Sequence, residues 1–91
     1  MLECSDGSLY TGWTVDPVKR FRAHQTGRGA KYTRARLPVR MVGLARCSSQ
    51  QEARRLEPQL KKLSRQDKLL WTKENPPAQF PELSASMRSI E

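Results

Sequence analysis

Residues 4–13 read CSDGSLYTGW, and this stretch decides how the N-terminal part of the chain folds. Its Asp-Gly pair is a strong signal for a tight hairpin, because such a turn needs residues that tolerate a positive φ. We therefore expect two antiparallel strands, a short one over residues 1–4 and a longer one over residues 8–14. Side chains alternate along a strand, so the ring of Tyr10 is expected to point to the opposite face from its two neighbours.

A helix is expected directly after the hairpin. Asp16 precedes Pro17, which places an N-cap aspartate before a proline in the first helical turn, and the helix should run to about Gln25. Residues 26–38 show no clear periodicity and are expected to form a loop. Residues 39–47 are rich in β-compatible side chains and are expected to form a third strand.

Two more helices are expected in the second half of the chain. Residues 49–52 read SQQE, which is a capping box, and residues 64–67 read SRQD, which resembles one. The first of these helices carries an apolar stripe at helical spacing, made of Ala53, Leu56, Leu60 and Leu63. The prolines at positions 76 and 77 are expected to end the regular structure.

The order ββαβαα predicts an α+β fold in which a three-stranded antiparallel sheet is flanked by helices. The chain has 91 residues, which is enough for one domain only. We expect this domain to occupy residues 1–75 and residues 76–91 to form a loosely ordered tail, with Phe80 and Leu83 as candidate anchors. Trp13 and Trp71 are expected in the core.

The charge of the chain predicts a polyanionic partner. The formal net charge is +8, and nine lysines or arginines but no acidic residue lie between positions 17 and 51. Nucleic acid and an anionic membrane surface both fit this charge, although no apolar run approaches the roughly 20 residues of a spanning helix. We find no secretory segment, so we expect a cytoplasmic protein whose Cys4 and Cys47 are reduced and buried rather than metal ligands.

Several motifs occur together in a fixed order. Tyr10 lies in LYTG, Arg20 and His24 follow on the first helix, and Glu57 precedes a pair of lysines. With the loop GRGAKYT at residues 27–33, these motifs resemble the GIY-YIG nuclease domain, most closely its small stand-alone bacterial branch. The similarity covers nearly the whole chain, including residues 80–83.

The resemblance implies a metal-dependent phosphodiester hydrolase. Tyr10 would match the tyrosine of the second signature triad, and Arg20 the helical arginine that contacts the scissile phosphate. His24 falls where the family places a residue near the attacking water. Glu57 would match the one carboxylate that holds the metal, Mg²⁺ or Mn²⁺. One carboxylate leaves Mg²⁺ mostly hydrated, as this ion prefers, and arginine pairs two phosphate oxygens with its planar fork.

The chain departs from the family pattern in two places. The first signature triad is absent, because its tyrosine would fall one position ahead of Met1. Either the chain as given lacks a few native N-terminal residues, or the protein has lost part of its site. Pro58 directly follows Glu57 where the family has an uninterrupted helix, and a proline there is expected to kink or restart the helix and re-aim the carboxylate.

Three functions remain open on the sequence alone. The first is an endonuclease of the GIY-YIG type that acts on DNA, with a phosphate-contacting patch made of Lys19, Arg28, Lys31, Arg34 and Arg36. The second is a nucleic-acid-binding module on the same fold with weak or no cleavage. The third is a basic protein associated with RNA or the ribosome. Without the resemblance, Tyr10 would be an ordinary packed aromatic, and Glu57 would pair with Arg54 or Lys61 on the surface.

Overall fold

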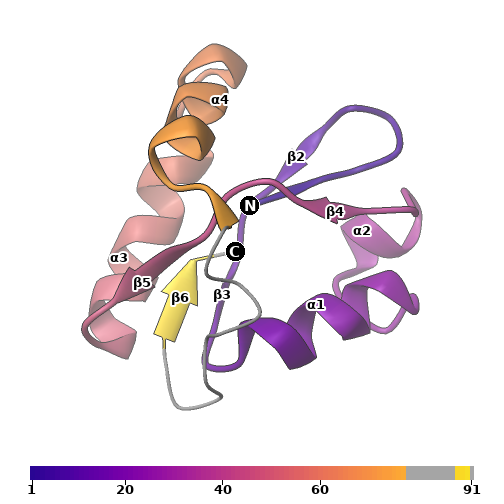
Figure 1. Ribbon diagram of the computed structural model, residues 1–91, viewed down its shortest axis with the longest axis horizontal. Helices are drawn as coiled ribbons and strands as arrows, with labels where there is room; N and C mark the ends of the chain where they lie inside the picture. The colour runs from indigo at the N-terminus through magenta and orange to yellow at the C-terminus, as the bar shows by residue number, and fades with distance from the viewer. Residues whose placement is uncertain (78–87, 91) are drawn as a thin grey trace.

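The computed structural model describes residues 1–77 and 88–90, which form an α+β domain (Figure 1). In the view of Figure 1, helices α3 and α4 flank the strands at one end of the molecule, and α1 and α2 lie at the other end. The elements are, in chain order, β1 (Leu2–Glu3), β2 (Leu9–Tyr10), β3 (Trp13–Thr14), α1 (Pro17–Gln25), α2 (Lys31–Arg34), β4 (Arg40–Met41), β5 (Ala45–Cys47), α3 (Gln50–Lys61), α4 (Arg65–Glu74) and β6 (Arg88–Ile90).

The strands form two antiparallel sheets of three strands each, ordered β2-β1-β4 and β3-β6-β5. The predicted α+β class, with a three-stranded antiparallel sheet flanked by helices, is confirmed. The predicted hairpin is also confirmed, because Leu2 pairs with Tyr10 across it. Gly7 has a φ of 83°, and its N–H donates to the carbonyl of Cys4 at 2.9 Å, which closes the turn.

Two predicted strands are each divided between the two sheets. The strand expected over residues 8–14 becomes β2 and β3, and the strand expected over residues 39–47 becomes β4 and β5. The second break surrounds Gly43, where the N–H groups of Val42 and Gly43 both donate to the carbonyl of Met1. A Cβ on Gly43 would lie 2.7 Å from Cζ3 of Trp71, so the chain passes against α4 only because this residue has no side chain.

The predicted helix starts are confirmed by their caps. The Asp16 carboxylate accepts from the N–H of Lys19, Ser49 accepts from Glu52, and Ser64 accepts from Asp67, each at 3.1 Å. Helix α3 runs through Pro58 to Lys61 without interruption. The expectation that Pro58 restarts the helix is therefore wrong, and Glu57 lies within regular helix.

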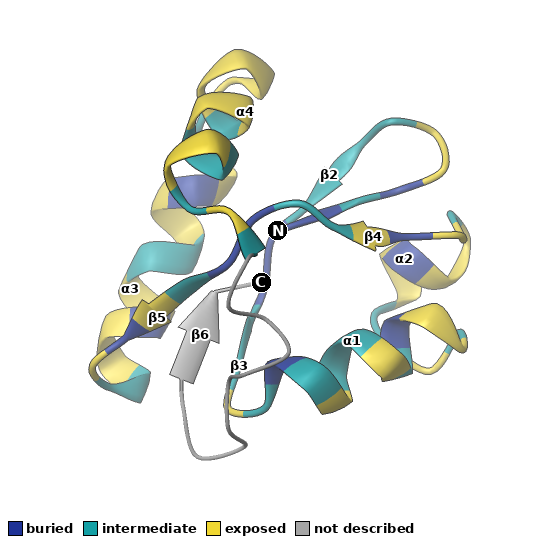
Figure 2. Ribbon diagram, in the orientation of Figure 1, coloured by how far each residue is buried: buried dark blue, intermediate teal, exposed yellow. Residues whose placement is uncertain are grey.

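Among the described residues, the core consists of two clusters, and Figure 2 shows buried segments in dark blue on the strand at the N-terminus and on helices α1 and α3. One cluster is built on Cys47, Ala53 and Leu60, and the apolar stripe of α3 packs here together with Trp13 and Trp71. The other cluster is built on Leu2, Cys4 and Val39, and Tyr10, Phe21 and Met41 pack against it. Both tryptophans therefore contribute to the core as predicted.

Two expectations about irregular segments are wrong. Residues 26–38 are not entirely a loop, because they contain the single-turn helix α2. The prolines at 76 and 77 do not end the regular structure, because β6 follows them and pairs with both β3 and β5. Phe80 and Leu83 lie outside the described residues, and the domain boundary at residue 75 stays a prediction.

Both cysteines are free and buried, as predicted, and burial raises the pKa of each thiol above its ordinary value. Within residues 1–77 and 88–90, none of the helices has the length and apolar character needed to cross a bilayer.

Candidate active site

Tyr10 lies at the centre of a group of polar and aromatic side chains. The pairing of β2 with β1 fixes its backbone, and its ring packs beside the core cluster that contains Leu2. The ring meets His24 edge-on at 5.3 Å between centroids and stacks on Tyr32 at 6.1 Å with an interplanar angle of 22°. Three residues that are distant in sequence thus come together, namely Tyr10 of β2, His24 of α1 and Tyr32 of α2.

His24 is fully buried behind Tyr10. Its Nδ1 lies 2.8 Å from the hydroxyl of Thr33, which is also fully buried and which donates to the carbonyl of Ala30 at 3.0 Å. A hydroxyl has a single proton, so once Thr33 gives it to Ala30 it can only accept from His24. Nδ1 is then the protonated nitrogen, and in the neutral ring the lone pair lies on Nε2.

The loop before α2 packs directly on this histidine. A Cβ added to Gly29 would lie 2.3 Å from Nδ1 of His24 and 2.9 Å from its Cα. These distances are shorter than any real carbon contact, so the close approach of the loop to α1 depends on the missing side chain of Gly29.

Gly29→Ala is therefore expected to destabilise the domain by about 1–3 kcal/mol, the usual cost of overpacking a tight contact. Thermal unfolding followed by circular dichroism measures this cost. In a His24→Ala background the same substitution should cost less, because the imidazole that blocks the new methyl group is gone. An equal cost in both backgrounds would show that the loop does not press on the histidine.

Glu57 and Lys61 form an ion pair one turn apart on α3. Lys61 Nζ lies 2.8 Å from Oε1 of Glu57, and the side chain of Glu57 is 22% exposed. This hydrogen bond raises the pKa of the Lys61 ammonium, and the phenol of Tyr10 contributes to the same shift. Since Tyr10 and Lys61 line the same pocket, the Glu57–Lys61 pair and Tyr10 belong to one neighbourhood.

Glu57 is the carboxylate that the sequence predicts as the metal ligand, and it belongs to no larger group of potential ligands among the described residues. Over residues 1–77 and 88–90, no group of three or more His, Cys, Asp or Glu side chains is close enough together to bind a metal ion. One carboxylate beside an open pocket fits a hydrated divalent cation that takes a single protein ligand. It does not fit an ion such as structural zinc, which needs a closed set of four ligands.

A pocket of about 280 Å³ opens next to this group. Two tyrosines and two lysines, one lysine from the end of α3 and one from α4, contribute to its wall. Its lining residues are Leu9, Tyr10, Thr11, Tyr32, Lys61 and Lys68.

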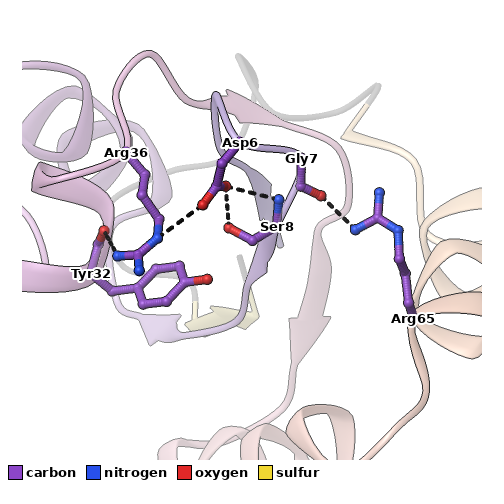
Figure 3. Close-up of polar contacts among 6 residues, drawn as sticks. All are labelled: Asp6, Gly7, Ser8, Tyr32, Arg36 and Arg65. Carbon is purple, nitrogen blue, oxygen red and sulfur yellow. Dashed lines mark hydrogen bonds and ion pairs between the residues drawn. The ribbon is translucent and has the colours of Figure 1, made fainter.

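Arg36 is engaged inside the molecule (Figure 3). Its Nε donates to Asp6 at 3.1 Å, its Nη1 donates to the carbonyl of Tyr32 at 3.0 Å, and its guanidinium lies 3.8 Å from the centre of the Tyr32 ring. Hydrogen bonds from Ser8, together with Arg36, hold the pKa of Asp6 below its ordinary value. Arg65 of α4 donates to the carbonyl of Gly7, so the hairpin turn is tied to both α2 and α4.

The other predicted residues lie around this centre. Arg20 is half-buried one turn before His24 and lines a separate hollow of about 230 Å³ together with Lys19. Lys19, Arg28, Lys31 and Arg34 are exposed, as expected of a patch that meets phosphates, whereas Arg36 is half-buried. The structure thus gathers Tyr10, His24 and the Glu57–Lys61 pair, and it places Arg20 and Lys19 beside another hollow.

The sequence analysis gave no site role to Tyr32, Thr33, Lys61 or Lys68. It did name Lys61 as a possible partner of Glu57, because a lysine four residues after a glutamate on a helix faces it, and the structure shows this pair. Thr33 and Tyr32 carry no such signal, because their contacts depend on how the loop after α1 folds back.

Comparison with known proteins gives a consistent picture. The model of the GIY-YIG catalytic domain matches residues 1–75. A UPF0213 protein of Streptococcus agalactiae is 52% identical over 75 residues, which cover 82% of this chain and 85% of that protein. A UPF0213 protein of Syntrophus aciditrophicus is 49% identical over 77 residues, covering 84% and 88%. No solved structure matches the chain significantly.

Proposed function

The chain belongs to the family of GIY-YIG catalytic domains, and from this premise we propose that it is a divalent-metal-dependent endonuclease that hydrolyses phosphodiester bonds in DNA. Domains of this family are nucleases, so the proposal adds the metal, the substrate and the residues that act. The observation that carries it is that Tyr10 and two lysines line one pocket, and that one of these lysines, Lys61, is paired with the Glu57 carboxylate.

Glu57 would hold the metal in this proposal. A bound Mg²⁺ or Mn²⁺ would supply positive charge to the phosphate and lower the pKa of bound water. The carboxylate is already oriented by regular helix, and its present partner is a lysine that an arriving cation would displace. Glu57 therefore supplies the negative charge that selects a cation at the edge of the pocket.

Tyr10 and His24 would act as a pair on the attacking water. Tyr10 lines the pocket, whereas His24 is fully buried and meets Tyr10 edge-on. His24 would therefore act on the substrate through the phenol rather than touch it. Thr33 would keep the histidine in the tautomer that leaves Nε2 basic.

Arg20 would clamp a phosphate oxygen with its guanidinium, which stays charged at all working pH values. Lys19 lines the same hollow as Arg20, and the exposed cations Arg28, Lys31 and Arg34 follow on the adjoining loop and on α2. Such cations neutralise backbone phosphates without reading bases. We therefore propose DNA as the partner, bound through its backbone, and a cytoplasmic location that accords with the two free thiols.

One observation favours a second function, that of a nucleic-acid-binding module with little cleavage. Lys61 already neutralises Glu57 at 2.8 Å, and this ammonium competes with a metal for the carboxylate. If the metal does not displace Lys61, the domain would bind the backbone without hydrolysing it.

Nicking of supercoiled plasmid separates these two functions. The chain is incubated with plasmid in Mg²⁺ and in EDTA, and duplex binding is measured under both conditions by fluorescence anisotropy. We expect nicks in Mg²⁺ and none in EDTA, while a mock purification from cells without the chain shows none in either. Binding under both conditions without any nicks would overturn the endonuclease proposal and support the binding module.

A further inference from the structure

We propose that Lys61, Lys68 and the hydroxyl of Thr11 form a second phosphate site, which holds the backbone phosphate next to the one that is cleaved. This inference rests on the proposed function, because it places the substrate strand across the pocket beside Tyr10. The proposed site uses lysines of α3 and α4. The phosphate-contacting patch predicted from the sequence contains only lysines and arginines between residues 19 and 36.

Charge is the first argument for an anion at this place. The pocket of about 280 Å³ is lined by one lysine from the end of α3, Lys61, and by one from the second turn of α4, Lys68. Lys68 is half-buried, unlike the exposed lysine Lys73 on the same helix. Lysine ammonium groups that converge from two rigid helices are suited to a phosphate, to which each donates as a point charge.

Thr11 is the second, independent argument. Thr11 is 3% exposed and lines the pocket, and its hydroxyl has no hydrogen-bond partner in the part of the chain that the structure describes. Buried hydroxyls are normally paired, so we infer that a small shift of this residue would let a ligand in the pocket supply the partner. A phosphate oxygen is a suitable partner, because it accepts the single proton of the hydroxyl and the protons of both ammonium groups.

The site adjoins the proposed cleavage centre through one residue. Lys61 pairs with Glu57 and also lines the pocket, so the proposed metal position and the second phosphate are neighbours. Since removal of Lys61 would change both positions, Lys68 is the cleaner probe of the phosphate site.

The test compares Lys68→Gln with Lys73→Gln, an exposed lysine on the same helix that does not line the pocket. Both changes remove one positive charge, so the total charge of the variants is matched. Duplex DNA binding is measured in EDTA by anisotropy over a series of salt concentrations. Lys68→Gln should weaken binding about fivefold to tenfold at 0.1 M salt and reduce the salt slope by about 1, while Lys73→Gln should leave the slope unchanged.

Thr11→Val provides a second variant that keeps the shape and the charge. It removes a hydroxyl that has no described partner, so the fold should tolerate it, and the expected result is a loss of affinity of about threefold to tenfold. Equal slopes for Lys68→Gln and Lys73→Gln, or wild-type affinity in Thr11→Val, would overturn the phosphate site.

This outcome is separate from that of the nicking experiment, because binding is measured without metal. If the wild-type chain nicks plasmid but Lys68→Gln binds with an unchanged slope, the endonuclease stands and the second phosphate site is wrong. If the slope falls as expected but the wild-type chain never nicks, the phosphate site stands and the endonuclease proposal is wrong.

Discussion

Glu57→Gln should reduce metal-dependent nicking by roughly 100-fold or more, on the scale of losing one electrostatic group of an active site. Among the described residues, no group of three or more His, Cys, Asp or Glu side chains could replace Glu57 as a metal site. Glutamine keeps the shape and the hydrogen-bonding oxygen but lacks the charge that holds a hydrated cation. Nicking is measured as the rate of plasmid relaxation at several Mg²⁺ concentrations.

The fold itself should be almost indifferent to this substitution. An i,i+4 ion pair on a helix surface stabilises by only about 0.3–0.5 kcal/mol, so the melting temperature is expected to change little. Glu74→Gln is the matched control, because it makes the same chemical change on an exposed glutamate of α4. Equal nicking by Glu57→Gln and Glu74→Gln would exclude Glu57 as the metal ligand.

The parts of the fold that sequence reasoning predicts are those set by neighbouring residues. The turn at Gly7 needs a positive φ, and the caps Asp16, Ser49 and Ser64 each bond a residue three positions later. These signals depend on chemistry within one turn, so they are visible in any short window of sequence. The apolar stripe of α3 is visible for the same reason, because its period is fixed by the helix.

The features of the fold that sequence reasoning does not predict depend on contacts between residues far apart along the chain. The breaks that divide two strands between two sheets follow from contacts such as Met1 with Gly43, separated by more than forty residues. Strand β6 forms by pairing with β3 on one side and β5 on the other. No local sequence pattern predicts this pairing. Helix α2 is a single turn whose first residue has no side-chain cap, so it lacks the signal that identified the other helices.

The candidate site shows the same division. Tyr10, His24 and Glu57 were found because motifs of a known family fall on them, and the structure adds what surrounds them. Thr33 lies nine positions after His24 and reaches it only because Gly29 lets the loop fold back. Lys68 reaches the pocket only because α4 packs beside the hairpin, where Arg65 bonds the carbonyl of Gly7. Tertiary contacts of this kind leave no trace in the spacing of a motif.

Tyr10→Phe is expected to lower the rate of nicking by about 100-fold to 10,000-fold, the usual range for a group that transfers or positions a proton. The substitution removes the hydroxyl alone. Phenylalanine keeps the packing on the cluster of Leu2, the edge contact with His24 and the stacking on Tyr32, so stability should be unchanged within about 0.5 kcal/mol. The rate is measured as single-turnover cleavage in Mg²⁺, with protein in excess over plasmid.

Tyr32→Phe is the control that isolates the role of the Tyr10 hydroxyl. It removes a phenol from the same pocket wall, so any effect of making the pocket less polar should appear in both variants. We expect at most about a fivefold loss in Tyr32→Phe, the equivalent of one ordinary hydrogen bond. DNA affinity in EDTA should be unchanged in Tyr10→Phe, since the hydroxyl is proposed to act on water and not to hold the strand. A Tyr10→Phe variant that nicks as fast as wild type would remove the phenol from the reaction and leave the charges on Glu57, Lys61 and Arg20 as its only agents.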